Sequence, residues 1–420
     1  MAKNQIVSVI FKDIEIGKMG YDENQRKSSF QFNPEFLNQN KYINLFPYII
    51  RRVENVQVFS EFEGETFRGL PPMIADSLPD MFGNIVFKEW LEASNKSFNS
   101  ISPLEQLTYV GSRGMGALEF MPNKQLPLNA SIDLQEITEI VKKVMDVKTA
   151  VSEKGLSDAA LLTIFKIGTS AGGVRPKILV SENKTNGELI PGDLVVSEDY
   201  NHYLIKLAVD ENQEYSKEKV EYVYYQLATQ IGIEMMPSKL IAAKHFATLR
   251  FDRQHGKKRH ILTAAGMTGW DFQKPDNSSY DNLFKLAVDL KLPHKDIQQL
   301  FKRMVFNLVF ANIDDHLKNF SFIYDDTKDK WNLAPAYDIT YPLDALLNYT
   351  RVTRALSING KRTNITIEDI LDLAKQFTIK NPMGIVDEVL EATNHFENLA
   401  KEQDLPSKVI EKIKSEFLFF

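Results

Sequence analysis

The most informative stretch of this 420-residue chain is Ala311-Asn312-Ile313-Asp314-Asp315-His316-Leu317-Lys318-Asn319-Phe320-Ser321. It follows a long apolar pattern of helical period and precedes a short segment that ends in Asp338. Asp314 and Asn319 are five residues apart. In phosphoryl-transfer loops this spacing separates an aspartate that takes the proton of the attacking hydroxyl from an asparagine that holds magnesium. The stretch therefore predicts a catalytic base at Asp314 and metal ligands at Asn319 and Asp338.

Each residue near this pair also has a plainer interpretation. Asp315 is the adjacent alternative to Asp314, but only Asp314 has an asparagine five residues later. Asp314 could instead cap a helix end, and Asp338 could form a turn. Lys318 lies between the base and the metal ligand, where a cation can stabilise the transferring phosphoryl group. His316 is assigned a supporting role in the loop, because phosphoryl transfer needs positioning and charge more than a second base.

A glycine-rich segment upstream supplies the expected phosphate site. Gly172 and Gly173 allow the backbone to approach a phosphate closely, and successive N–H groups there can form an anion-binding nest. Lys177 follows at the head of a predicted strand. A second glycine cluster, residues 111–120, is interpreted as a tight turn packed on the core. A phosphate role there is the weaker alternative, because no lysine follows at the spacing of a P-loop.

Lys206 is the candidate for a lysine that binds the nucleotide phosphates. It stands among apolar residues in a predicted strand, residues 203–208, where an ammonium group is unfavourable unless it reaches a negative charge. The alternative is a lysine on an edge strand whose ammonium reaches solvent. A helix beginning near Ser216 offers Glu221, fifteen residues after Lys206, as its stabilising partner.

Composition sets broad limits on the class of protein. The chain is 43% hydrophobic and 25% charged, which is typical of a globular protein with two or three domains. The net charge of −6 gives no domain-wide basic field for nucleic acid, although it leaves a local patch possible. The absence of cysteine removes disulfides and thiolate zinc sites and fits a reducing cytoplasm. No signal peptide or membrane span is predicted, so we expect a cytoplasmic protein.

The pattern of apolar residues divides the chain into three parts. Residues 5–32 read as strands around glycine turns, and the chain from about residue 280 reads as helices. Ser102, followed by proline and by Glu105, predicts a helix start. We predict an α+β protein with domains at residues 1–125, 126–253 and 254–420.

Five motifs together carry a family resemblance. The motifs are Leu78-Pro79-Asp80-Met81-Phe82-Gly83, Gly111-Ser112-Arg113-Gly114-Met115-Gly116-Ala117-Leu118-Glu119-Phe120, residues 168–177, Arg250-Phe251-Asp252-Arg253, and residues 312–319 with 336–339. In this order they resemble the HipA-type toxin serine/threonine kinases of bacterial toxin–antitoxin systems. The resemblance covers nearly the whole chain.

The resemblance implies a two-lobed protein-kinase-like fold, with an N-terminal β-rich subdomain and an all-helical C-terminal lobe. It implies that ATP and Mg²⁺ are the cofactors. Ser170 matches the serine that this family autophosphorylates, and its phosphorylation is expected to expel the glycine loop and silence the enzyme. Leu249 to Phe251 match the adenine-binding hinge. Leu249 departs from the family, which often has a glutamate there, but hinge bonds use backbone groups.

The resemblance also implies partners. They are a small DNA-binding antitoxin of the HipB type, DNA reached mainly through that antitoxin, and a protein substrate such as an aminoacyl-tRNA synthetase. Two other functions stay open. One is a small-molecule kinase of the aminoglycoside or lipid type, which shares the Asp–Asn loop. The other is a non-catalytic co-repressor that joins an antitoxin on DNA.

Overall fold

The structure, a computed structural model, describes residues 5–79, 81–93, 95–123, 133–146, 175–192, 196–209, 215–342 and 353–420. The chain divides into two compact units. Unit 1 comprises residues 1–211, 247–262 and 266–269, and unit 2 comprises residues 212–246, 263–265 and 270–420. Along the sequence, the chain changes from one unit to the other within strand β10 (His245–Leu249). It changes again within β13 (Ile261–Thr263) and within α8 (Ala264–Thr268). The three predicted domains stay a prediction.

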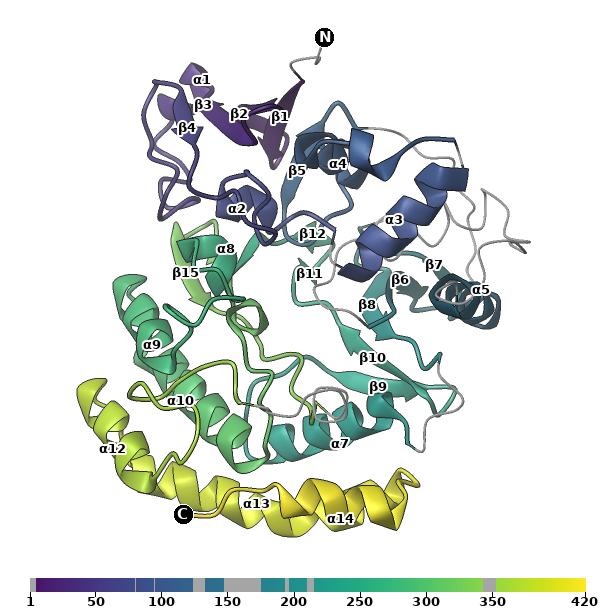
Figure 1. The fold of residues 1–420 in the computed structure, drawn as a ribbon, viewed down its shortest axis with the longest axis vertical. Helices are drawn as coiled ribbons and strands as arrows, with labels where there is room; N and C mark the ends of the chain where they lie inside the picture. Colours follow the sequence, from purple (N-terminus) through teal and green to yellow (C-terminus); the bar gives the residue numbers. More distant parts are fainter. Residues whose placement is uncertain are drawn as a thin grey trace. The chain divides into compact units, whose positions relative to one another are not determined.

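The N-terminal part of unit 1 is an antiparallel sheet with the strand order β4-β3-β2-β1-β5 (Figure 1). Its strands are β1 (Ile6–Phe11), β2 (Ile14–Asp22), β3 (Lys27–Phe32), β4 (Gln57–Phe59) and β5 (Leu118–Met121). Val7, Val9 and Phe11 alternate along β1 and are almost fully buried, so one face of this sheet carries a core. The β-rich start predicted from the sequence is confirmed.

The helices of unit 1 lie between the later strands of this sheet along the chain, and α5 follows its last strand. They are α1 (Pro34–Leu37), α2 (Pro72–Ala75), α3 (Met81–Ala93), the 3₁₀ turn η1 (Phe98–Ser100), α4 (Pro103–Val110) and α5 (Leu134–Asp146). The predicted start of α4 is confirmed, because the Ser102 side chain accepts a hydrogen bond from the backbone N–H of Glu105 at 3.0 Å.

A second sheet in unit 1 has the strand order β7-β6-β8-β10. Besides β10, its strands are β6 (Lys177–Asn183), β7 (Leu189–Pro191) and β8 (Tyr200–Lys206). A separate short hairpin of β11 (Arg253–Gln254) and β12 (Lys257–Lys258) follows β10 along the chain. Lys206 is the last residue of β8, rather than a residue of its middle as predicted. Because β8 lies between β6 and β10, the interpretation of Lys206 as an edge-strand lysine is wrong.

Unit 2 is mainly helical. Its elements are α7 (Lys217–Gln230), β9 (Ser238–Ile241), α9 (Tyr280–Asp289), α10 (His294–Val309), the 3₁₀ turn η2 (Leu317–Asn319), β14 (Ser321–Asp325), β15 (Lys330–Leu333), α12 (Ile367–Gln376), α13 (Pro382–Glu402) and α14 (Ser407–Ser415). Tyr224 of α7 packs edge-on against Phe306 of α10 and Phe396 of α13, so three helices share one aromatic core. The helix predicted to begin near Ser216 is confirmed, because Ser216 is the N-cap of α7 and its side chain accepts a hydrogen bond from the backbone N–H of Lys219.

The prediction of an all-helical C-terminal lobe needs one correction. The antiparallel hairpin of β14 and β15 interrupts the helices immediately after η2. Its signal is the apolar run from Phe320 to Tyr324, which is too short for a helix and is followed by an aspartate-rich turn. The α+β class itself is confirmed.

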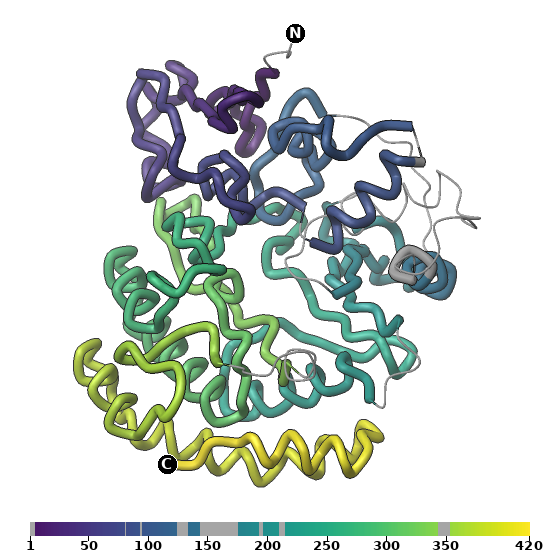
Figure 2. The backbone as a smooth tube through the Cα atoms, viewed as in Figure 1, coloured from purple at the N-terminus to yellow at the C-terminus, as the bar shows by residue number. Residues whose placement is uncertain are grey.

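The C-terminus is docked in part. Figure 2 follows the chain from α13 into α14, which runs back beside it. Phe417 packs on Phe310 and Phe396, and the backbone N–H of Leu418 donates to the carbonyl of Val309 at 3.0 Å. Phe419 is 63% exposed, so the docked part of the C-terminus ends at Leu418. None of the described helices is both long and apolar enough to cross a membrane.

Candidate active site

The stretch around Asp314 is a loop delivered by α10. Helix α10 is buried along its apolar stripe and ends at Val309, so the loop begins on a rigid base. The Asn312 side chain turns back to donate to the Asn307 side chain of that helix at 2.9 Å. Further along, the side-chain amide of Asn319 donates to the backbone carbonyl of Asp314 at 2.7 Å. This bond closes the loop, and it gives a structural reason for the spacing of five residues between them.

The two neighbouring aspartates differ completely in environment. Asp315 is 1% exposed and accepts hydrogen bonds from the Tyr280 hydroxyl at 2.7 Å and from the Arg354 guanidinium at 2.9 Å. Burial and the negative charge of Asp315 raise the pKa of Tyr280 well above its usual value. The side chain of Asp314 is 61% exposed. Of the two carboxylates, only Asp314 is accessible to a substrate hydroxyl.

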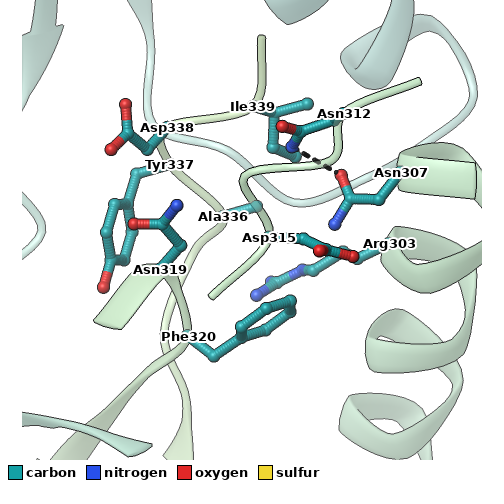
Figure 3. A pocket seen from close by; sticks show the side chains of 10 residues that line it. All are labelled: Arg303, Asn307, Asn312, Asp315, Asn319, Phe320, Ala336, Tyr337, Asp338 and Ile339. Carbon is teal, nitrogen blue, oxygen red and sulfur yellow. Dashed lines mark hydrogen bonds between the residues drawn. The ribbon is translucent and has the colours of Figure 1, made fainter. Parts of the chain in front are cut away.

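Asp338 lines the same pocket as Asn319. Figure 3 shows both residues with Tyr337 on one side of it, and Asn307 and Arg303 reaching in from α10 on the other. The backbone of Asp338 is left-handed, with φ at 56°, a conformation that costs energy for a residue with a β-carbon and is common at functional sites. The hydroxyl of Tyr337 donates to the carbonyl of Lys318 at 2.7 Å, so the Asp338 segment is tied to the loop.

The metal-binding potential of this pocket rests on few groups. Among the described residues, no cluster of three or more His, Asp or Glu side chains could hold a metal ion. Asn319 and Asp338 offer one amide oxygen and one carboxylate, both hard ligands. Magnesium usually takes one or two carboxylates and completes its shell with water and substrate phosphates. The donor set therefore fits a magnesium ion that arrives with a phosphorylated substrate.

Arg303 is a residue of this pocket that the sequence analysis missed. It is 3% exposed, and its Nε atom has no hydrogen-bond partner among the described residues. Burial lowers the pKa of Arg303 to about 10, although the charges of Glu234 and Asp296 oppose the change. A signal was present, because Arg303 and Asn307 stand about one helical turn apart, next to the apolar stripe of α10.

His316 and Lys318 flank the buried Leu317 in the η2 turn. The Nε2 atom of His316 lies 3.9 Å from a carboxylate oxygen of Asp314, so the ring lies beside the predicted base. Lys318 is half-buried on the same turn as Asn319. The structure thus brings together Asp314, His316, Lys318 and Asn319 in one loop of unit 2.

The predicted nucleotide residues divide between the units. Lys177 and Lys206 lie directly opposite each other on β6 and β8 of unit 1, and both are buried, at 3% and 7% exposure. Leu249 ends β10 and is half-buried, and Phe251 is buried in the turn that follows. Glu221 is buried in α7 of unit 2. Ser170, Gly172 and Gly173 lie outside the described residues.

Two family models match this chain. The HipA N-terminal domain matches residues 7–121, and the HipA-like C-terminal domain matches residues 169–405. The chain belongs to the HipA family. The resemblance noted from the sequence motifs is therefore confirmed.

Individual HipA-family relatives are distant. The serine/threonine-protein kinase toxin HipA of Shewanella oneidensis is 23% identical over 259 residues, which span 55% of this chain and 54% of that protein. The putative kinase Y4dM of Sinorhizobium fredii is 25% identical over 163 residues, 38% of this chain and 39% of that protein. The chain thus spans about half or less of the length of these curated relatives.

A solved structure shares the fold over nearly the full length. The complex of HipA, HipB and operator DNA from Shewanella oneidensis contains a chain with a TM-score of 0.61 and 16% identity. The match covers 98% of this chain and 95% of that one. This likeness confirms a two-lobed, kinase-like α+β fold of the HipA type.

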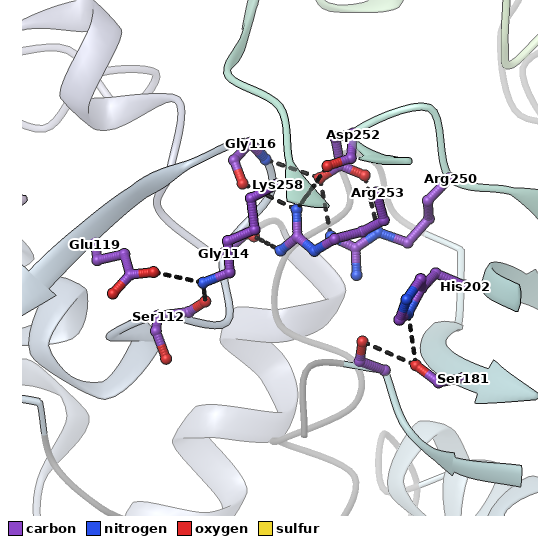
Figure 4. A network of polar contacts seen from close by, with 11 residues as sticks. Ser112, Gly114, Gly116, Glu119, Ser181, His202, Arg250, Asp252, Arg253 and Lys258 are labelled. Atoms are coloured by element: carbon purple, nitrogen blue, oxygen red, sulfur yellow. Dashed lines mark hydrogen bonds and ion pairs between the residues drawn. The ribbon is translucent and has the colours of Figure 1, made fainter. Parts of the chain in front are cut away.

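In unit 1, a buried ionic cluster joins the region of the HipA N-terminal domain to that of the C-terminal domain (Figure 4). Asp252 accepts two hydrogen bonds from Arg250, both at 2.9 Å, and one from Arg253 at 2.8 Å. It also accepts the backbone N–H of Gly116 at 2.8 Å, while Arg253 donates to the carbonyls of Gly114 and Gly116 at 2.9 Å. The interpretation of the 111–120 glycine cluster as a tight, packed turn is confirmed.

The charges of this cluster compensate one another. Burial alone would raise the pKa of Asp252, but Arg250, Arg253 and the Gly116 N–H outweigh burial and hold that pKa well below its usual range. Gly116 has φ at 78°, and an added β-carbon would lie 3.3 Å from the Ile261 nitrogen. The motif residues Arg250, Asp252 and Arg253 therefore have a structural role.

Proposed function

We propose that this HipA-family chain is an ATP- and Mg²⁺-dependent serine/threonine protein kinase, the toxin of a toxin–antitoxin module. The observation that carries the proposal is the arrangement of residues around the Asp314 loop of unit 2. The exposed carboxylate of Asp314 is held through its own backbone by Asn319, and Asn319 lines one pocket with Asp338. A base and two oxygen ligands fixed in one loop system are what phosphoryl transfer requires of a protein.

Each residue of the loop has a role in this mechanism. Asp314 accepts the proton of the substrate hydroxyl as the hydroxyl oxygen attacks the terminal phosphorus of ATP. The bond from that phosphorus to the bridging oxygen breaks, and ADP leaves. Asn319 and Asp338 would hold the magnesium ion, which neutralises charge on the phosphates when it is bound. Lys318 stabilises negative charge on the transferring phosphoryl group. His316 supports the loop beside Asp314 and takes no proton.

The lysine pair of unit 1 supports a phosphate site. Lys177 and Lys206 are cross-strand partners on one face of the sheet, and both are buried. Two ammonium groups on neighbouring strands can both donate charge-assisted hydrogen bonds to one polyanionic ligand. We propose that both bind ATP phosphates, with Gly172, Gly173 and Ser170 in the glycine loop, Leu249 and Phe251 at the adenine, and Glu221 orienting Lys206.

Control and partners extend the proposal. A phosphate on Ser170 adds roughly −1.5 to −2 charges where the triphosphate belongs, so autophosphorylation there would switch the kinase off.

A HipA of Shewanella oneidensis forms a complex with HipB and operator DNA. By analogy, we propose a small HipB-like antitoxin as partner and DNA contact mainly through it. The substrate class is a translation-related protein such as an aminoacyl-tRNA synthetase.

The decisive experiment compares the two neighbouring aspartates. Purified full-length wild type, Asp314→Asn and Asp315→Asn are incubated with ATP and Mg²⁺, and phosphate transfer and thermal unfolding are measured. Asp314→Asn should lose about 10²- to 10⁴-fold in rate with an unchanged melting temperature, because its exposed carboxylate supports little structure. Asp315→Asn should unfold at lower temperature. Wild-type turnover in Asp314→Asn would sink the assignment of the base.

Phosphoproteomics of cells that express the wild type or Asp314→Ala then identifies the substrate, and the same spectra test Ser170. Transfer to small molecules alone favours the alternative of an aminoglycoside- or lipid-type kinase. No transfer by the wild type favours the co-repressor.

A further inference from the structure

Phe272 contacts the proposed catalytic loop from a segment 42 residues upstream of Asp314. A turn presents its ring: the N–H of Lys274 donates to the carbonyl of Asp271 at 2.9 Å, and the N–H of Gln273 donates to the Asp271 carboxylate at 3.1 Å. The ring centroid lies 5.0 Å from that of His316. The Nζ atom of Lys318 lies over the same ring, 5.3 Å from its centroid. One aromatic side chain thus holds both residues that flank Leu317.

The contact with Lys318 differs from the other restraints on this loop. Within the part of the chain that the structure describes, the Lys318 ammonium forms no hydrogen bond and no ion pair, and the Phe272 ring is its contact. An aromatic face attracts a cation through its quadrupole and carries no net charge. A carboxylate in the same place would also hold the lysine, but it would cancel the positive charge.

We infer that Phe272 is a positioning residue, which restrains Lys318 beside Asp314 and Asn319 while leaving its charge available to the transferring phosphoryl group. The inference rests on the proposed kinase function. It deepens that function by explaining how a half-buried lysine of this loop is kept oriented without being neutralised. The contact with His316 adds a second restraint to the same 3₁₀ turn.

A packing role for Phe272 makes different predictions from an electrostatic one. Fluorination of the ring weakens its attraction for a cation stepwise and leaves its shape nearly unchanged. A ring that only fills space would tolerate the fluorines, whereas a ring that holds Lys318 through its quadrupole would not. Position 11 is a matched control, because Phe11 in unit 1 has Lys12 at 6.0 Å from its centroid and lies outside the proposed site.

The experiment places mono-, di- and trifluorinated phenylalanine at position 272, and separately at position 11, of the full-length chain. The rate at saturating ATP is measured with the proposed substrate or through autophosphorylation. We expect a progressive fall to about 3- to 10-fold below wild type for the position-272 series, the size of a partly desolvated cation–π contact. The position-11 series should keep the wild-type rate. A flat response at position 272 overturns the inference.

Two further variants separate restraint from charge. Phe272→Glu can hold Lys318 but neutralises it, so it should be at least as slow as Phe272→Leu. Activity of Phe272→Glu above that of Phe272→Leu contradicts the inference.

A measurement independent of activity keeps this test separate from that of the kinase proposal. In NMR spectra the Lys318 ε-methylene protons should show an upfield ring-current shift that Phe272→Leu abolishes. Absence of the shift refutes the contact itself. If the ring-current shift is present but the protein transfers no phosphate, the proposed kinase function is contradicted. The positioning role assigned to Phe272 then fails with it, although the contact itself stands.

Discussion

The Asp252 cluster of unit 1 and the Asp314 loop of unit 2 use charged side chains in opposite ways. In unit 1, Asp252 is fully buried and four hydrogen bonds from Arg250, Arg253 and Gly116 compensate it. In unit 2, the carboxylate of Asp314 is 61% exposed, and an aromatic ring rather than an acid restrains Lys318. The charge of Asp252 is thus buried and compensated by its partners, whereas the charges of Asp314 and Lys318 in the proposed catalytic loop keep their sign and are not fully buried.

Unit 2 repeats the contrast between adjacent residues. Asp315 resembles Asp252, because it is buried and receives a guanidinium and a hydroxyl. Arg354 also donates to the carbonyls of Asn307 and Asn312, so it fastens the start of the loop to α10. The structural aspartate fixes the backbone from which its neighbour presents a carboxylate to solvent. The rigid cluster is therefore what makes the exposed group precise in position.

The largest effect on stability is expected from breaking the buried Asp252 cluster of unit 1. Asp252→Asn removes the charge that compensates two buried arginines, and breaking a buried pair in this way costs about 3–5 kcal/mol. We expect unit 1 to unfold at lower urea concentration, measured by limited proteolysis or tryptophan fluorescence.

The matched control is Lys258→Met. Lys258 binds Glu119 at 2.6 Å in the same region, but the two side chains are 20% and 29% exposed, so the loss should be about 1 kcal/mol or less. Equal losses for the two variants would contradict the distinction between buried and partly exposed charges.

The sequence was sufficient where one segment carries the information. The spacing of Asp314 and Asn319, the N-cap at Ser102 and the strand headed by Lys177 depend on residues a few positions apart, and the structure contains each element. The catalytic, metal and nucleotide roles of the site residues stay predictions, since spacing shows which groups are near one another and not what they bind.

The sequence was insufficient where distant segments meet. Phe272 and Arg354 lie 42 residues before and 40 residues after Asp314, and neither has a local pattern that points to the loop. The partners of Asp252 on the glycine turn lie about 136 residues upstream. Arg303 could have been found, because Arg303 and Asn307 recur at helical spacing next to the apolar stripe of α10. Tertiary contacts of this kind decide which of two adjacent aspartates is buried.

A second prediction concerns a group that is buried without charge. Burial lowers the pKa of His260 to about 3, from an unfolded value near 6.5. Between these values the unfolded chain binds the proton and the folded chain does not, so stability falls as pH falls. From pH 7 to pH 5 the loss attributable to His260 should be about 2 kcal/mol.

Urea unfolding at both pH values measures the loss, in the wild type, in His260→Phe and in the control His255→Gln, which changes an exposed histidine. The pH-dependent loss should be smaller by this amount in His260→Phe and unchanged in His255→Gln. If the stability of His260→Phe falls between pH 7 and pH 5 as much as that of the wild type, groups other than His260 cause the loss.

The smallest effect is expected where charges are paired but exposed. Glu397 of α13 binds Lys401 at 2.7 Å and Lys414 of α14 at 2.6 Å, and these hydrogen bonds lower its pKa to about 2. A depressed carboxyl pKa stabilises the fold above the unfolded pKa and loses that effect as pH falls through the folded value. The Glu397 side chain is 40% exposed, however, so solvent and salt screen both pairs. We therefore expect Glu397→Gln to unfold at the same urea concentration as the wild type at 0.15 M salt, at pH 7 and at pH 4. A clear destabilisation that disappears at high salt would show that pairing alone stabilises this protein, and burial would then no longer separate Asp252 from the exposed charges.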